Sequence, residues 1–169
     1  MDINFYYYMR YLSSDEEKKA LEYIAKATEV AQNATCERSK CGSVIVQLDD
    51  IIGSGFNSPP QDIEEQRRCS YSKDSYHKKV TDKTCCVHAE QRAILEALKN
   101  NSSEVPGSTL LFVRLDENDQ PKHSGEPYCT ICSKMALDVG IGKFCLWHKE
   151  GWTAYDTKYY NELSFQYKE

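Results

Sequence analysis

The chain has 169 residues, 40% of them apolar and 28% charged, which fits one globular domain over residues 1–169 and excludes a disordered or fibrous protein. Its 21 basic and 26 acidic residues leave a net charge of −5, which offers no general attraction for a phosphate backbone and makes nucleic acid a less favoured partner. The longest apolar runs are much shorter than the roughly 18 residues of a membrane span, and the N-terminus has no basic leader, so we expect a soluble, cytoplasmic protein with no membrane partner.

The chain contains eight cysteines. In a reducing compartment, thiols more often bind metal or react than form a disulfide framework. The cysteine content therefore favours a metal-binding protein.

The first predicted helix lies in the stretch 13–35, with its apolar stripe running to Ala31. Ser13 or Ser14 serves as its N-cap with a glutamate three residues later, and an apolar stripe follows at helical spacing. Before this helix, Phe5, Tyr8 and Leu12 also share helical spacing. We interpret this tyrosine-rich stretch as a packing surface or a subunit contact rather than a base-stacking platform.

Residues 42–60 predict a β-hairpin, with two apolar strands around the acidic turn Asp49-Asp50 and a loop containing Asn57 at its end. Residues 61–84 are polar and lack periodicity, which predicts an extended loop with room for a short helix. A loop of this length is usually functional or anchored to the rest of the protein.

A second helix is predicted to begin at about residue 89, which puts His88 and Glu90 at its first turn. Further elements are expected in this order: a buried strand over 108–115, a polar turn or small flap over 116–126, a helix over 129–139 stopped by Gly140, a short strand over 143–147 and a helix-poor tail that packs on the sheet.

Strands that alternate with helices after a hairpin predict an α/β fold. We expect a three-layer α/β/α sandwich with a mixed sheet of about five strands.

Two short motifs carry the chemistry. His88-Ala89-Glu90 stands at one predicted helix start, and Cys129-Thr130-Ile131-Cys132 stands at another. A C-x-x-C pair at a helix start places two sulfur atoms close enough to bind one cation, and an imidazole from elsewhere supplies a third ligand that zinc accepts. Three protein ligands leave one tetrahedral position for water, and a nearby glutamate is then able to exchange a proton with that water. The pattern therefore predicts a catalytic Zn²⁺ site.

These residues resemble the H-x-E and P-C-x-x-C pattern of the zinc-dependent cytidine and deoxycytidylate deaminase superfamily. The resemblance covers most of residues 36–150, with "GSVIV", "IIGSGFN", "CVHAEQRAILEAL", "LLFVRL", "EPYCTIC" and "ALDVGIGKF" in the family's order. The loop "GSGFNSPP" and the cysteine-rich stretch before "HAE" look most like deoxycytidylate deaminases. The family's sheet sandwich is similar to the fold expected above.

The resemblance implies roles for individual residues. His88, Cys129 and Cys132 are the implied zinc ligands, and Glu90 is the implied proton shuttle. Asn57 matches the residue that holds the sugar, and Ala89 matches the residue whose backbone N–H meets the base. The implied activity is hydrolytic deamination of a cytosine nucleotide or nucleoside, dCMP-like, to the uracil form by zinc-activated water. A small-molecule substrate and a homo-oligomer are the implied partners.

Other functions stay open at this stage. The same zinc chemistry serves deaminases of nucleic acid and of purines such as guanine or adenosine, and a non-catalytic zinc-stabilised binding module is a further alternative. The residues that would bind a phosphate are not distinguished by the sequence, which offers eight candidates: Lys40, Arg67, Arg68, Lys73, Lys78, Lys79, Arg92 and Arg114.

Two features depart from the family pattern. Tyr128 stands between Pro127 and the first ligand cysteine, and residues 116–125 are extra length that leaves the shape of the substrate pocket open.

Some deoxycytidylate deaminases carry an additional structural zinc, and the resemblance raises this possibility here. Its ligands would be Cys36, Cys69, His77 and either Cys85 or Cys86, and the metal would anchor the long loop.

Overall fold

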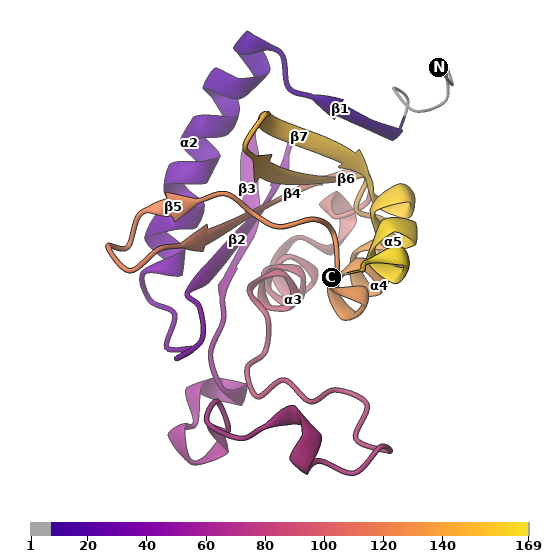
Figure 1. Cartoon of the computed structure of the whole chain (residues 1–169). Coiled ribbons are helices and arrows are strands. Elements are labelled where there is room, and N and C mark those ends of the chain that lie inside the picture. The colour runs from indigo at the N-terminus through magenta and orange to yellow at the C-terminus, as the bar shows by residue number, and fades with distance from the viewer. Residues whose placement is uncertain (1–7, 169) are drawn as a thin grey trace.

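The computed structural model describes residues 8–168, which form a mixed β-sheet with helices on both of its faces (Figure 1). The strands are β1 (Met9–Tyr11), β2 (Cys41–Gln47), β3 (Asp50–Phe56), β4 (Thr109–Leu115), β5 (Pro121–Lys122), β6 (Lys143–His148) and β7 (Gly151–Asp156). The α-helices are α2 (Ser14–Ala31), α3 (Ala89–Asn101), α4 (Thr130–Asp138) and α5 (Thr157–Gln166). None of the helices in this part of the chain is both long and apolar enough to cross a membrane.

The sheet has the strand order β1-β7-β6-β4-β2-β3, and β5 pairs with β4 off this path. The pairing of β4 with β6 is parallel, and the other pairings are antiparallel. The predicted mixed sandwich is therefore confirmed. The sheet has seven strands rather than about five, because the short strands β1 and β5 add to it.

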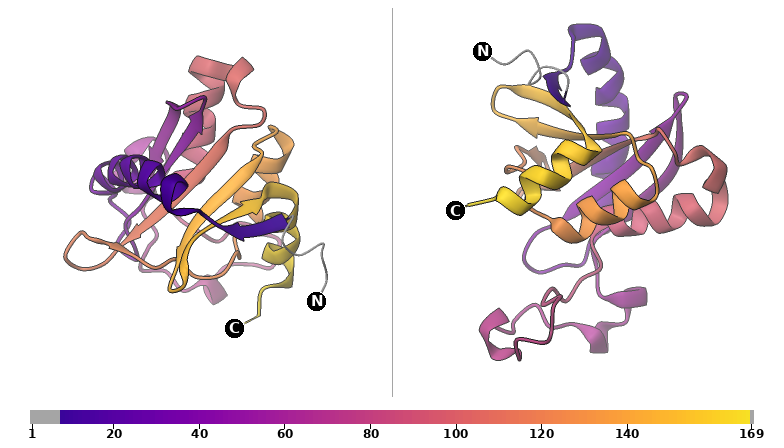
Figure 2. Two further views of the ribbon diagram at one scale, coloured as in Figure 1. Left: turned by 90° about the horizontal axis from the view of Figure 1, so that it is seen from above. Right: turned by 90° about the vertical axis from the view of Figure 1, so that its right-hand side faces the viewer.

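The two faces of the sheet are covered by different helices (Figure 2). Helix α2 packs on one face, and α3, α4 and α5 pack on the other. Strand β2 shows how the sequence achieves this, because Val44 and Val46 belong to the cluster under α2 while Ile45 belongs to the cluster under α3. Alternating apolar residues thus bury both faces of a central strand.

The start of α2 is fixed by a capping box. The Ser13 hydroxyl accepts a hydrogen bond from the Glu16 backbone N–H at 3.4 Å, and the Glu16 carboxylate accepts one from the Ser13 N–H at 2.9 Å. These bonds satisfy amide groups that have no acceptor within the helix. Ser13, not Ser14, is therefore the N-cap.

The turn of the β-hairpin lies one residue earlier than predicted. Leu48 and Asp49 have positive φ values of 47° and 75°, while Asp50 already belongs to β3. Such a two-residue turn matches the twist of the flanking strands. The prediction of an Asp49-Asp50 turn was wrong because the φ requirement, not the acidity, selects the turn residues.

Helix α3 lies unusually close to β3. A Cβ atom placed on Gly55 would lie 2.5 Å from the Ala89 carbonyl oxygen, and one on Gly53 would lie 2.4 Å from the Ala93 carbonyl oxygen. Two glycines on the strand and alanines on the helix make this approach feasible. The strand therefore fixes where the first turn of α3 sits.

The N-terminal stretch is not helical over Met9–Tyr11, which form β1 and pair with β7. The helical spacing noted there is therefore not used by these residues, and Phe5 lies outside the described residues. Leu12 packs against the cluster under α2. The aromatic rings of Tyr8 and Tyr159 lie side by side, with their centroids 5.9 Å apart. A packing role is confirmed for this part of the stretch, because pairing with a sheet edge outweighs the local periodicity.

The C-terminal segment is not a helix-poor tail. It forms β7 and then α5, whose N-cap Asp156 accepts hydrogen bonds from the N–H groups of Lys158 and Tyr159. Tyrosine side chains of this segment pack against the sheet. The ring of Tyr160 stacks on the ring of Phe144, with the two centroids 4.0 Å apart. Tertiary contact thus overrides a weak local propensity.

Residues 57–88 form the long loop, which includes the predicted range 61–84. It contains three short 3₁₀ turns, Pro60–Asp62, Glu64–Gln66 and Lys73–Ser75, and one isolated bridge between Ser58 and Val87 closes its base. Figure 1 shows the loop extending away from the sheet below α3.

Candidate zinc centre and substrate cavity

Two helix starts that are far apart in sequence meet on one face of the sheet. His88 is the N-cap of α3, Cys129 is the N-cap of α4, and Cys132 follows in the first turn of α4. The Nδ1 atom of His88 lies 3.2 Å from Sγ of Cys132, and the two sulfur atoms are 3.1 Å apart. The structure therefore brings the three predicted ligands together in one group.

This group fits a zinc ion in its chemistry and nearly in its size. Zinc binds thiolate sulfur at about 2.3 Å and imidazole nitrogen at about 2.0 Å, so tetrahedral ligands lie roughly 3.5 to 3.8 Å apart. The nitrogen–sulfur separations of 3.2 and 3.3 Å are slightly shorter than this, and the sulfur–sulfur separation of 3.1 Å is shorter by roughly 0.7 Å, so the side chains would have to move outward to admit the ion. Within residues 8–168, the group contains one nitrogen and two sulfur ligands and no fourth.

The three groups strongly perturb one another's ionisation. Hydrogen bonds with the Cys132 and His88 side chains lower the pKa of the Cys129 thiol to about 4. Burial opposes charge on His88, but the hydrogen bond with Cys129 and the charges of Glu90 and Cys129 outweigh it and raise the pKa of the imidazole to about 9. The hydrogen bond with Cys129 and burial together raise the pKa of Cys132. The thiolate of Cys129 thus faces the positively charged imidazole of His88. A bound metal ion would also place a positive charge beside this thiolate.

Glu90 is the second residue of α3 and only 7% exposed. Burial raises the pKa of its carboxyl group, and the nearby charge of His88 partly opposes that shift. A buried carboxyl with a raised pKa is suited to taking up and returning a proton.

A cavity of about 210 Å³ opens onto this group. Its wall contains the predicted residues His88, Ala89, Glu90, Cys129 and Asn57. The residues around them come from the segment between α2 and β2, from three strands, from the long loop, from the segment before α4 and from α5: Cys36, Arg38, Ser39, Cys41, Lys73, Thr84, Phe112, Arg114, Ser124, Gly125, Glu126, Tyr128, Leu146 and Tyr160.

Asn57 has a more definite local role than its sequence suggests. Its Oδ1 atom accepts a hydrogen bond from the Cys41 N–H at 2.8 Å, and its Nδ2 atom donates to the Ser39 carbonyl at 2.8 Å. Both ends of the amide are therefore engaged by the backbone. Asn57 lines the cavity and also holds the segment that leads into β2.

Tyr128 and part of the extra segment belong to the cavity wall. Tyr128 is 49% exposed, and its hydroxyl oxygen accepts a hydrogen bond from Nη2 of Arg114 at 3.0 Å. Ser124 and Gly125 also line the cavity, while the preceding residues pair β5 with β4. The two departures from the family pattern thus both reach the substrate cavity.

The structure separates basic residues that the sequence left equivalent. Three of the phosphate candidates pair with carboxylates, namely Arg67 with Glu64, Arg92 with Asp62, and Lys40 with Asp119. Lys73 and Arg114 line the cavity. Arg38 lines it too and was not among the candidates. A basic residue just before the first strand of a hairpin was the only signal for it.

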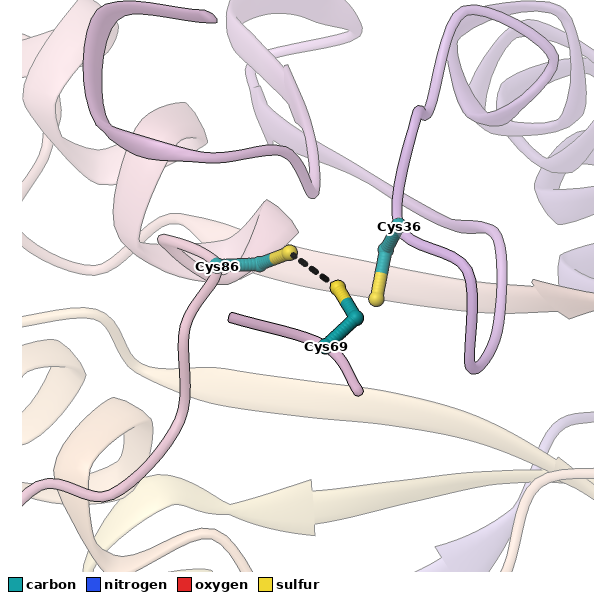
Figure 3. Close-up of side chains that lie close together, drawn as sticks. All are labelled: Cys36, Cys69 and Cys86. Atoms are coloured by element: carbon teal, nitrogen blue, oxygen red, sulfur yellow. Dashed lines mark hydrogen bonds between the residues drawn. The ribbon is translucent and has the colours of Figure 1, made fainter. Parts of the chain in front are cut away.

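A second group of side chains contains only cysteines. Cys36 follows α2, Cys69 lies in the long loop and Cys86 precedes α3, and their sulfur atoms point toward one another (Figure 3). The three sulfur atoms lie within 4.8 Å of each other. Cys85 is beside them, with its Sγ atom 3.1 Å from Sγ of Cys69 and 3.5 Å from Sγ of Cys86. We call these four residues the thiol cluster.

His77 lies outside the thiol cluster. Its side chain is exposed, and its Nδ1 atom accepts a hydrogen bond from the Lys79 N–H at 3.2 Å. The expectation that His77 joins the cysteines was therefore wrong. His77 follows Cys69 by eight residues, and the 3₁₀ turn at Lys73–Ser75 lies between them.

Comparisons with known proteins agree with this geometry. Residues 17–147 match the model of the cytidine and deoxycytidylate deaminase zinc-binding region. The deoxycytidylate deaminase of Mycobacterium phage D29 is 29% identical over 125 residues, which are 70% of this chain and 86% of that protein.

Two solved structures share the fold. The dCMP deaminase of cyanophage S-TIM5, in complex with dCMP and dUMP, gives a TM-score of 0.53 at 23% identity over 79% of this chain and 81% of that one. A cytidine deaminase from Burkholderia pseudomallei gives a TM-score of 0.53 at 14% identity over 88% and 96%.

The fold and the site define a zinc-dependent deaminase, a hydrolase acting on a C–N bond. The chain belongs to the cytidine and deoxycytidylate deaminase family.

Proposed function

We propose that the protein deaminates a free cytosine nucleotide of the dCMP type to the corresponding uracil nucleotide. The observation that carries this proposal is the convergence of His88, Cys129 and Cys132 beside the buried carboxyl of Glu90, at the inner end of a cavity. The similarity to phage deoxycytidylate deaminases supports the choice of nucleotide.

In this proposal His88, Cys129 and Cys132 hold the zinc ion. Zinc, when bound, supplies a Lewis acid that makes water nucleophilic at neutral pH. Glu90 takes a proton from the attacking water, delivers a proton to the ring nitrogen and then assists the departure of ammonia. Its burial keeps bulk water from competing for that proton.

Ala89 contributes through its backbone. It is the first residue of α3, so its N–H has no acceptor within the helix, and it lines the cavity. We propose that this N–H donates a hydrogen bond to the base of the substrate, which would fix the position of the ring relative to Glu90. Asn57 would meet the sugar, and its own bonds to the backbone keep it in one orientation.

The rival substrates are less well supported. A nucleic-acid deaminase needs a surface that tracks a charged backbone, and the net charge of −5 does not favour one. For a purine substrate, the similarity to a phage deoxycytidylate deaminase favours a cytosine nucleotide instead. The oligomeric state and the single-domain organisation stay predictions.

We also propose that the thiol cluster binds a structural zinc ion. The sulfur atoms of Cys69, Cys85 and Cys86 lie 3.1 to 3.9 Å apart, close to the roughly 3.8 Å of a tetrahedral zinc–thiolate site, and that of Cys36 lies within 4.8 Å of those of Cys69 and Cys86. The metal would tie the long loop to the end of α2 and the start of α3. Such closed sites stabilise polar segments that have little apolar surface to bury.

The test of the activity is a panel of cytosine and purine nucleosides, their monophosphates and triphosphates, free bases and short oligonucleotides, scored for ammonia release. We expect release from dCMP, with Glu90→Gln as the inactive control. Faster release from a purine or an oligonucleotide would replace the proposed substrate, and release unaffected by Glu90→Gln would contradict the proposed mechanism.

A further inference from the structure

Arg114 is a cation in the cavity wall without an anionic partner. Arg114 is partly buried, and its Nη2 atom donates a hydrogen bond to the Tyr128 hydroxyl oxygen at 3.0 Å. Its Nε atom is buried and has no hydrogen-bond partner. Among residues 8–168, no carboxylate lies within 4.0 Å of the Arg114 guanidinium.

This situation differs from that of the other partly buried arginines. The side chain of Arg67 is 15% exposed and pairs with Glu64, and that of Arg92 is 20% exposed and pairs with Asp62. Removing a charge from water costs free energy unless a partner of opposite charge compensates it. Arg114 meets only the neutral or weakly acidic groups of Tyr128 and Cys41, so an anion that enters the cavity would compensate its charge.

The cavity contains further groups suited to an anion. Arg38 and Lys73 line it, and neither forms an ion pair among the described residues. The guanidinium of Arg38 is oriented by the carbonyl oxygens of Cys69 and Tyr71 at 3.0 and 2.9 Å. Ser124, also in the wall, has a buried hydroxyl without a partner. Three cations without a carboxylate partner thus line this cavity, whose wall also contains the carboxyl groups of Glu90 and Glu126.

The position of Arg114 relative to the sugar site is set by the sheet. Arg114 on β4 is the register partner of Cys41 on β2, and Cys41 in turn binds Asn57 at the end of β3. The three residues therefore form a row across neighbouring strands along one wall of the cavity. If the sugar of a nucleotide contacts Asn57, the group attached to that sugar would lie within reach of Arg114.

We propose that Arg114 is the residue that makes the site specific for a nucleotide, by pairing with the phosphate group of the substrate. A guanidinium presents a planar fork of donors that matches phosphate oxygens, and charge-assisted bonds of this kind are stronger than those to neutral acceptors. The Tyr128 hydroxyl holds one Nη2 donor and so fixes the plane of the fork. This inference deepens the proposed function and depends on it for the identity of the base.

The test compares Arg114→Gln with the unmodified enzyme on dCMP and on deoxycytidine. We expect KM for dCMP to rise roughly tenfold to a hundredfold, from the loss of charge-assisted hydrogen bonds, while the kinetics with deoxycytidine change little. Arg114→Lys should recover part of the loss, because it restores the charge without the fork. Arg68→Gln is the matched control, since Arg68 is exposed and lies outside the cavity.

A binding measurement separates this inference from the proposed activity. The zinc-loaded protein and its variants are titrated with dUMP, deoxyuridine and inorganic phosphate. We expect Arg114→Gln to weaken the binding of dUMP and of phosphate and to leave the binding of deoxyuridine nearly unchanged. Equal losses for dUMP and deoxyuridine, or unchanged binding of all three ligands, would overturn the inference even if dCMP is deaminated. If no cytosine compound is deaminated but phosphate binding still depends on Arg114, only the proposed activity fails.

Discussion

The Nδ1 atom of His88 lies 3.3 Å from Sγ of Cys129, although 41 residues separate them in the chain. Neither residue alone identifies a metal site, because a histidine or a cysteine at a helix start is common. Their contact, with Cys132 in the same group, is the feature from which the mechanism follows.

Replacement of a ligand should remove one zinc ion and the activity together. We expect His88→Ala and Cys132→Ala to lose one equivalent of zinc and to reduce turnover by at least about 10³-fold, because a Lewis acid contributes several kcal/mol to the barrier. Metal analysis and ammonia release measure both effects. Cys145→Ala is the control, since Cys145 is buried in β6 and belongs to neither cysteine group. Full zinc in His88→Ala would refute the assignment.

Glu90→Gln should separate metal binding from catalysis. The amide keeps the size of the side chain but cannot exchange the proton, so we expect kcat to fall on the order of 10²- to 10⁴-fold while zinc content stays unchanged. Glu104→Gln provides the control, because Glu104 is exposed and outside the cavity. A variant at position 90 that keeps most of its activity would require a different proton carrier.

The thiol cluster should hold a second zinc ion. We expect two zinc equivalents per chain, and Cys69→Ser should lose one of them and make residues 57–88 more susceptible to proteolysis, because the metal would cross-link the loop to Cys36 and to the segment before α3. His77→Ala should behave like the unmodified protein, since His77 is exposed and outside the cluster. A single zinc equivalent in the unmodified protein would eliminate the structural site but leave the catalytic one intact.

The capping box predicts different effects at two adjacent serines. Ser13→Ala should lower the free energy of unfolding by about 1 kcal/mol, because it removes the acceptor for the Glu16 N–H. Ser14→Ala should have a smaller effect, since Ser14 is already the first residue of the helix. Urea unfolding of both variants measures the difference, and equal losses would show that Ser13 is not the working cap.

Glu16 should contribute an acid-dependent part of the stability. Its hydrogen bond with Arg10, 2.7 Å long, lowers the pKa of the Glu16 carboxyl to about 2. A lowered folded-state pKa means that the contribution is present above the unfolded value, near 4.5, and is lost as the pH falls toward 2. The Glu16 side chain is 43% exposed, so solvent screening keeps this contribution small.

Comparison with Glu16→Gln isolates this effect. The stability difference between the two proteins should be largest near neutral pH and should shrink between about pH 4.5 and 2. Glu17→Gln, in the same helical turn, serves as the control. A difference that grows on acidification would have the wrong sign for a lowered pKa.

The sequence by itself determined the sandwich fold, the main helices and strands, and the three candidate ligands with Glu90. These depend on local signals, such as the capping motif at Ser13 and the positive φ of Gly140 that ends α4, and on two motifs with recognisable spacing. Such signals act over a few residues, so they can be read along the chain.

Only the tertiary structure decided which distant residues meet. It formed β1 and β7 from segments with weak local signals, because pairing with a sheet supplies hydrogen bonds that the segment alone cannot show. It placed His77 outside the thiol cluster and left Arg114, among several basic residues, without a carboxylate partner. Burial and charge pairing are properties of the folded neighbourhood, and one-dimensional spacing does not contain them.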